Sequence, residues 1–160
     1  MVSSFLHPFA KPTKGDFITL VRGQGAVVYD EAGNEYIDGM ASLWYCAVGH
    51  GRSDIAAAIG RQAGTLAAYS TFDPFTNWPA EQLADELVAI SPMADARVFF
   101  TSSGSEAVDT AMKLSRLAHI QAGHPEKTLI ISRQRGYHGT AYGGTSAQGI
   151  APNREGYAPY

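Results

Sequence analysis

The feature that most constrains the fold is a pair of short apolar runs with a helix start between them. Residues 97–101 (Arg-Val-Phe-Phe-Thr) and 128–132 (Thr-Leu-Ile-Ile-Ser) have the composition of buried strands. Between them, Ser103 and Glu106 have the three-residue spacing of a capping box, which predicts a helix ending at Gly123. A strand, a helix and a second strand form a βαβ unit, which requires a parallel sheet. We therefore expect an α/β fold.

Three further elements are predicted along the first half of the chain. Two β-rich runs within residues 26–38 flank Gly33 and Asn34, which tolerate the positive φ of a hairpin turn. A helix is expected to begin at Ser53 as its N-cap, because apolar residues follow at roughly helical spacing. A second helix is expected from about residue 79 to 90, with a proline in its first turn and Ser-Pro after its end.

The composition limits the function classes. The chain has 160 residues, the size of one domain or of a piece of a larger one. At 45% hydrophobic and 17% charged residues, it is apolar enough to form a core. Its net charge is −3, and its basic residues are spread along the chain without a run. We therefore exclude a dedicated nucleic-acid binder, which would carry a basic patch.

The sequence also lacks the patterns of membrane and exported proteins. No apolar run approaches the ~20 residues that a spanning helix needs. Residues 1–12 show no basic segment followed by an apolar core, so we expect no signal peptide. Cys46 is the only cysteine and has no basic residue beside it, which favours a buried structural thiol over a nucleophile. These patterns predict a soluble, cytoplasmic protein with no metal site and no membrane partner.

The turn Ser103-Gly104-Ser105 is a candidate anion site. The first N–H groups of a helix have no partner within the helix, and the helix dipole adds partial positive charge there. Small residues let a phosphate approach, and a serine hydroxyl adds a donor. An ordinary serine-capped helix is the alternative. The Walker A, dinucleotide-binding, nucleophile-elbow and zinc-protease motifs are not matched.

Two aromatic positions are candidates for a ligand site. Tyr137 and His138 follow the second predicted strand, and side chains after adjacent parallel strands meet at one edge of the sheet. We therefore expect Tyr137 near the 103–105 turn, where its ring could stack on a flat ring attached to a phosphate. A core tyrosine is the alternative. Trp44, among small residues, could either line an apolar pocket or fill a core.

Four segments, in this order, resemble the class III, or ω-type, pyridoxal-phosphate (PLP) aminotransferases. They are Gly33-Asn34-Glu35-Tyr36-Ile37-Asp38-Gly39, Leu43-Trp44 with Gly49-His50-Gly51, Phe99-Phe100-Thr101-Ser102-Ser103-Gly104-Ser105-Glu106-Ala107, and Gly136-Tyr137-His138-Gly139. The likeness runs from about Phe5 to at least Ile150. The Leu43-Trp44 pair and the leading His7-Pro8-Phe9 are most similar to the amine–pyruvate and β-alanine–pyruvate branch.

The resemblance implies a fold, a reaction and a set of roles. The chain would be the N-terminal part of a fold-type I PLP-dependent transferase, with residues 1–50 in the small domain and 51–160 in the first part of the large α/β domain. The full-length protein would be a homodimer that transfers an amino group from an amine or ω-amino acid to pyruvate. The implied cofactor-binding residues are Ser103, Gly104, Ser105, Tyr137 and His138, and the implied substrate-pocket residues are Phe9, Trp44 and Phe72.

The resemblance also implies residues that this chain does not match. Family members are more than twice as long and use a lysine that forms a Schiff base with the cofactor, beyond the Tyr-His-Gly motif. The lysines here are Lys11, Lys14, Lys113 and Lys127, and none falls at that position. We therefore expect no catalytic residue in this chain and no transamination by it alone. A non-catalytic truncated product, a weak PLP-phosphate binder or subunit-association module, and an unrelated phosphate-binding α/β domain remain as alternatives.

Overall fold

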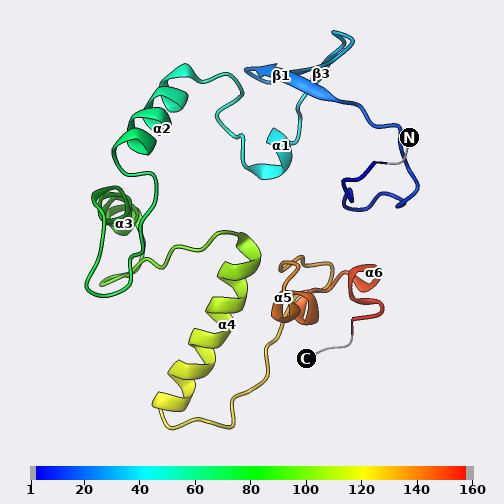
Figure 1. Ribbon diagram of the computed structural model, residues 1–160. Coiled ribbons are helices and arrows are strands. Elements are labelled where there is room, and N and C mark those ends of the chain that lie inside the picture. Colours follow the sequence, from blue (N-terminus) through cyan, green and yellow to red (C-terminus); the bar gives the residue numbers. More distant parts are fainter. Residues whose placement is uncertain (1–2, 158–160) are drawn as a thin grey trace. The chain divides into compact units, whose positions relative to one another are not determined.

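The computed structural model describes residues 3–157, and its backbone contacts group into two compact units, 1–77 and 78–160. Figure 1 shows the elements in chain order, from the blue strands to the red helix near the C-terminus. The first unit holds the β-strands and two helices, and the second unit holds four helices joined by extended segments. The expected division into domains at residue 50 stays a prediction.

The first unit contains a three-stranded antiparallel sheet. Its strands are β1 (Leu20–Gln24), β2 (Val27–Asp30) and β3 (Glu35–Ile37), in the order β1-β2-β3. The predicted hairpin is confirmed as β2 and β3, whose register pairs Val28 with Tyr36. The sequence analysis did not identify β1, which has Gly23 within it and pairs with β2 through an irregular register.

The turn between β2 and β3 is organised by the Asp30 carboxylate. Its Oδ1 accepts the backbone N–H groups of Ala32 and Asn34 at 3.0 and 2.8 Å. Its Oδ2 accepts the Asn34 side-chain amide and the Tyr36 hydroxyl, both at 2.9 Å. Gly33 adopts φ of +84°, which a residue without Cβ reaches at little cost. These four hydrogen bonds, all accepted by the Asp30 side chain, fix the conformation of the turn.

Two helices complete the first unit. The short α1 (Ala41–Trp44) is a left-handed turn in which all four residues have φ between 47° and 83°. The next helix, α2 (Ser53–Thr65), confirms the predicted helix, but its N-cap is Arg52 rather than Ser53 and no side chain caps it. The Ser53 hydroxyl therefore does not have the capping role that its residue type predicted.

The second unit begins with two longer helices. The predicted helix at 79–90 is confirmed as α3 (Trp78–Ile90). The helix of the capping box is confirmed as α4 (Gly104–Gln121). It is closed after its C-cap Ala122 by Gly123, where φ is +82° and the N–H of His124 donates to the carbonyl of His119, as in a Schellman motif. Two short helices follow, α5 (Tyr142–Ala147) and α6 (Ala151–Arg154), and α5 packs on α4.

The prediction of parallel strands at residues 97–101 and 128–132 is wrong for the described structure. Both segments run without strand pairing, and the sheet that does form is antiparallel. Leu129 and Ile131 are 91% and 95% exposed. Parallel strands form ladders when neighbouring strands pair with them and helices cover both faces of the sheet. Within residues 3–157 neither condition is met at these two segments, so apolar composition alone does not make them strands.

The described residues include no buried apolar side chain. In the first unit α2 contacts neither the sheet nor α1, and in the second unit α3 contacts neither α4 nor α5. Their apolar positions therefore face solvent, as at Ile59 (64% exposed) and Ile90 (79% exposed). No helix among these residues combines the length and the apolar character that crossing a bilayer requires.

Candidate functional site

The site is built on the first turn of α4. Ser103 adopts an extended conformation (φ −158°, ψ 161°), and its Oγ accepts the Glu106 N–H at 3.2 Å. The Glu106 carboxylate reaches back one residue further than a standard capping box and accepts the Ser102 N–H at 2.9 Å. The predicted cap is thus confirmed, with its return bond shifted by one residue. This cap fixes the residue at which α4 begins and therefore which backbone N–H groups lie in its first turn.

Two of those N–H groups are available to a ligand. Across residues 3–157, no acceptor is found for the backbone N–H of Gly104 or of Ser105. A Cβ built on Gly104 would meet no atom within 4 Å, so the space before the helix is open. Since the helix dipole adds partial positive charge at this end, the turn has the donors and the room for an anion.

The Ser105 side chain connects this turn to the loop that carries Tyr137. Its Oγ accepts the backbone N–H of Thr140 at 2.9 Å and lies 3.4 Å from the Thr140 hydroxyl. The oxygen of Ser105 is therefore occupied as an acceptor, while its hydroxyl hydrogen can turn toward Thr140 or toward a ligand. The segment after Tyr137 thus lies against the start of α4, without a parallel sheet to bring the two together. That the Tyr137 ring itself lies at the turn stays a prediction.

A second hydrogen bond from the same face of α4 holds the loop further along. Asp109 Oδ1 accepts the backbone N–H of Gly144 at 2.8 Å. Ser105 and Asp109 are four residues apart on the helix and hold Thr140 and Gly144, which are also four residues apart. The sequence analysis missed Asp109; its signal was the four-residue spacing from a candidate site serine on a predicted helix.

Small residues allow the loop to come this close. Gly139 has φ of +110°, and a Cβ there would lie 2.7 Å from the Ser105 Cα. The Tyr137 side chain, two residues earlier, is 58% exposed and open to a ligand. The His138 ring is half-buried, and its Nε2 is enclosed without a hydrogen-bond partner among the described residues. These features give the loop an exposed aromatic ring and one unsatisfied polar atom.

The three residues predicted for a substrate pocket all lie in the first unit. Phe9, Trp44 and Phe72 are 100%, 85% and 83% exposed. Phe9 borders a surface hollow of about 430 Å³, which is also lined by Pro8, Ala10, Lys11, Thr13 and Lys14. No ring contact joins the three side chains in the described part of the chain. The first unit therefore does not gather them into a pocket by itself.

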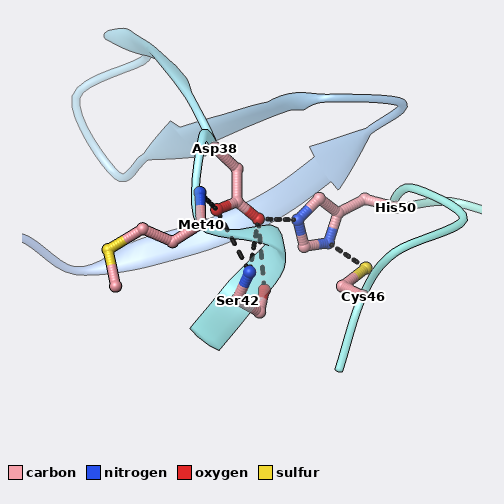
Figure 2. A network of polar contacts seen from close by, with 5 residues as sticks. All are labelled: Asp38, Met40, Ser42, Cys46 and His50. Carbon is pink, nitrogen blue, oxygen red and sulfur yellow. Dashed lines mark hydrogen bonds and ion pairs between the residues drawn. The ribbon is translucent and has the colours of Figure 1, made fainter. Parts of the chain in front are cut away.

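A polar network that was not predicted from the sequence joins Ser42 of α1 to His50 through Asp38. Figure 2 shows the Asp38 carboxylate between the left-handed turn and the His50 ring, with Cys46 on the far side of that ring. Asp38 Oδ2 is 2.8 Å from His50 Nε2, and His50 Nδ1 is 3.5 Å from Cys46 Sγ. The His50 hydrogen bond lowers the pKa of Asp38 below its ordinary 3.8. Cys46 is half-buried and does have a basic partner, four residues later in the sequence.

Comparisons with known proteins match the whole span of these features. The family model of class-III aminotransferases matches residues 9–158. The β-alanine–pyruvate aminotransferase of Pseudomonas aeruginosa is 40% identical over 136 residues, which are 85% of this chain and 30% of that protein.

Two solved structures have the same fold. A transaminase from the marine bacterium Virgibacillus has a TM-score of 0.92 at 39% identity and is matched over 98% of this chain and 36% of its own. The ω-transaminase of Pseudomonas jessenii in complex with PMP (pyridoxamine phosphate) has a TM-score of 0.91 at 35% identity. The match covers 96% of this chain and 34% of the transaminase chain. The chain spans about a third of the length of these relatives. With its α/β fold of the fold-type I kind, the chain belongs to the class-III aminotransferase family.

Proposed function

We propose that this chain forms the phosphate- and ring-binding part of a PLP-dependent aminotransferase. The observation that carries the proposal is the hydrogen bond from the Thr140 N–H to Ser105 Oγ. It holds the loop of Tyr137 and His138 against the first turn of α4, where two N–H groups have no acceptor among residues 3–157. A phosphate and an attached aromatic ring need these two kinds of contact side by side.

The residues present suit the cofactor in chemistry as well as in position. The N–H groups of Gly104 and Ser105, with the hydroxyl hydrogen of Ser105, would hold the phosphate, and Ser103 would fix the turn. The exposed Tyr137 ring would stack on the pyridine ring. His138, whose Nε2 has no partner among the described residues, would support the loop or the cofactor. When bound, PLP supplies the electron sink for amino-group transfer.

The chain's own residues bind and orient in this proposal, and none moves a proton. Lys113 lies within α4, and Lys127 follows the end of that helix. Neither lies at the Tyr137 loop or in the first turn of α4. We propose accordingly that the nucleophilic lysine is not among the residues of this sequence, and that these 160 residues do not catalyse transamination by themselves.

For the whole protein we propose an amine or ω-amino acid as donor and pyruvate as acceptor. The support is the 40% identity to a β-alanine–pyruvate aminotransferase and the 36% identity to a putrescine–pyruvate aminotransferase, both of Pseudomonas aeruginosa. Phe9, Trp44 and Phe72 would then line the substrate pocket. A homodimer and a cytoplasmic location stay predictions that accompany this proposal.

The ring contact is tested by titrating the chain with pyridoxamine phosphate (PMP) and following the ligand's fluorescence. PMP carries an amine in place of an aldehyde, so it does not react with the four lysines. Tyr137→Ala should weaken binding about fivefold, since an aromatic pair contributes ~1 kcal/mol beyond its buried area. Tyr137→Phe should bind like the unchanged chain.

Tyr157→Ala is the matched control, because Tyr157 is also 58% exposed but lies beyond α6. It should leave the affinity unchanged. Equal weakening by Tyr137→Ala and Tyr157→Ala would contradict a specific ring contact.

A non-catalytic product is the second candidate, favoured by the missing lysine match. The intact mass and absorbance spectrum of the protein from its natural source separate the two. A mass more than twice 17.1 kDa with the absorbance of lysine-bound PLP supports the aminotransferase. A mass of 17.1 kDa without that absorbance supports the non-catalytic product.

A further inference from the structure

Cys46 is one end of a three-residue chain of polar contacts in the first unit. The order is carboxylate, imidazole and thiol, with 2.8 Å from Asp38 Oδ2 to His50 Nε2 and 3.5 Å from His50 Nδ1 to Cys46 Sγ. Figure 2 shows the two ring nitrogens directed at the two partners on opposite sides of the imidazole. A nucleophile beside a base that a third group orients is the arrangement that activates a thiol.

The Asp38 contact determines what the other ring nitrogen can do. A carboxylate only accepts hydrogen bonds, so the proton of the neutral imidazole must lie on Nε2. That leaves Nδ1 as an acceptor facing the thiol. The pKa of Asp38 is lowered chiefly by this His50 contact, so the carboxylate is ionised at neutral pH.

The base is held in place by backbone pairing. His50 forms an isolated bridge with Gly25, in which His50 N–H donates to the Gly25 carbonyl at 2.8 Å and Gly25 N–H donates to the His50 carbonyl at 3.0 Å. Gly23 of β1 lies against the ring, and a Cβ there would come 2.7 Å from His50 Cγ. The imidazole therefore has one strand packed against it and cannot turn freely.

The orienting carboxylate is equally constrained. Asp38 accepts the backbone N–H of Ser42 at 2.8 Å and that of Met40 at 3.3 Å. Only 13% of the Asp38 side chain and 20% of the His50 side chain are exposed. The pair thus lies away from most solvent, where its electrostatic effect on the thiol is less screened. Cys46 itself is half-buried, so the residue is not closed off from solvent.

We infer that Cys46 is a reactive thiol, activated by the His50–Asp38 pair, and that small hydroperoxides oxidise it to a sulfenic acid. The thiol proton moves to His50 Nδ1, and the sulfur attacks the hydroxyl oxygen of the hydroperoxide as the O–O bond breaks. An S–O bond forms, and the departing hydroxide (from hydrogen peroxide) or alkoxide (from an organic hydroperoxide) takes the proton from His50 and leaves as water or an alcohol. Sulfur is oxidised by two electrons, and the peroxide is reduced by two. This inference is independent of the proposed cofactor site, which uses other residues.

The test uses the alkylation rate of the whole chain with iodoacetamide at neutral pH, followed by intact mass. Cys46 is the only cysteine, so the rate reports on this thiol alone. A free thiol is only a few per cent ionised at neutral pH, so activation should make the native chain about tenfold faster than the same chain in denaturant. A native rate equal to or below the denatured rate would overturn the inference.

Variants separate activation from exposure. His50→Gln should reduce the rate to that of the denatured chain or below, and Asp38→Asn should give an intermediate rate. Ser42→Ala is the control, because it removes only a 3.3 Å hydroxyl contact to Asp38 and keeps the backbone bond. Its rate should stay within twofold. A fast His50→Gln chain would show that exposure, not the base, causes the reactivity.

The oxidation step is tested with hydrogen peroxide and dimedone, which traps sulfenic acids. The unchanged chain should gain one dimedone adduct, whereas Cys46→Ser should gain none. His50→Gln should form the adduct about tenfold more slowly. Fast alkylation without a dimedone adduct would overturn the assignment of hydroperoxide as the oxidant.

Discussion

At the scale of single residues, short polar networks define the local structure of the first unit. Asp30 accepts four hydrogen bonds within a turn that includes Asn34 and Tyr36. Asp38 similarly binds the left-handed turn of α1 and the His50 ring. Each carboxylate replaces several interactions with water by fixed donors, which favours its ionised form. In the described part of the chain, where no apolar side chain is buried, these networks fix the local conformation.

The Asp30 network predicts a loss of the hairpin turn in acid. The Asn34 side-chain hydrogen bond is the largest cause that lowers the pKa of Asp30 below 3.8. A lowered pKa in the folded state stabilises the turn fully above pH 3.8. That stabilisation is lost as the pH falls through the lowered value. The acid transition of the Asn34 backbone amide shift in NMR should therefore have its midpoint below pH 3.8.

Asp30→Asn serves as the control for that titration. It keeps a side-chain oxygen but has no charge to neutralise, so its Asn34 amide should show no transition in acid. A midpoint for the unchanged chain at or above pH 3.8 would contradict the network's effect on the carboxyl group.

At the scale of elements, the helices were predictable because their signals are local. The cap at Ser103 and the left-handed Gly123 lie within a few residues of the ends of α4 that they fix. The turn at Gly33 was predictable for the same reason. The segments 97–101 and 128–132 were not, because a strand exists only where a partner pairs with it. Their apolar composition carries no information about whether that partner is present.

The contacts between different elements also could not be predicted from local sequence signals. Asp109 holds Gly144 across 35 residues of chain, and Ser105 holds Thr140 across another 35. The sequence placed Ser105 and Tyr137 in one candidate site through an expected parallel sheet. The structure instead brings their segments together with two side chains on one face of α4. Gly139 and Thr140 lie against Ser105, and the position of the Tyr137 ring relative to that turn stays a prediction.

Replacement of glycine by alanine is expected to have opposite effects at two positions. Gly139→Ala should loosen the loop, because φ is +110° and the added Cβ would lie 2.7 Å from the Ser105 Cα. Gly60→Ala lies within α2, where a Cβ meets nothing within 4 Å, and it should stabilise that helix by up to about 1 kcal/mol. Hydrogen exchange at the Thr140 amide should be about tenfold or more faster in Gly139→Ala, since such backbone strain costs ~1–3 kcal/mol.

Gly60→Ala should leave Thr140 exchange unchanged and increase the helical circular dichroism signal. Unchanged Thr140 exchange in Gly139→Ala would contradict the close approach of the loop to α4.

At the scale of the whole molecule, the described residues have helices with apolar faces but no apolar core. Leu114, Leu117 and Ile120 of α4 are 47–54% exposed, and Leu129 and Ile131 are exposed almost completely. Soluble monomers rarely leave large apolar patches exposed, so exposure of this many apolar side chains favours association.

This exposure predicts that the 160-residue chain self-associates or is poorly soluble. Size-exclusion chromatography with light scattering should show species larger than 17.1 kDa, and heating should give a broad transition. A single sharp peak at 17.1 kDa with cooperative melting would contradict the prediction.

The central claim is that the first turn of α4, together with the loop after Tyr137, holds the phosphate of a pyridine cofactor. Equilibrium dialysis of the chain against PMP and against pyridoxamine tests it most directly, because the two ligands differ only in the phosphate. The N–H groups of Gly104 and Ser105 should make PMP bind at least about tenfold more tightly, the effect of ~1.4 kcal/mol from a helix N-terminus and its donors. Equal affinity for the two ligands would contradict the claim.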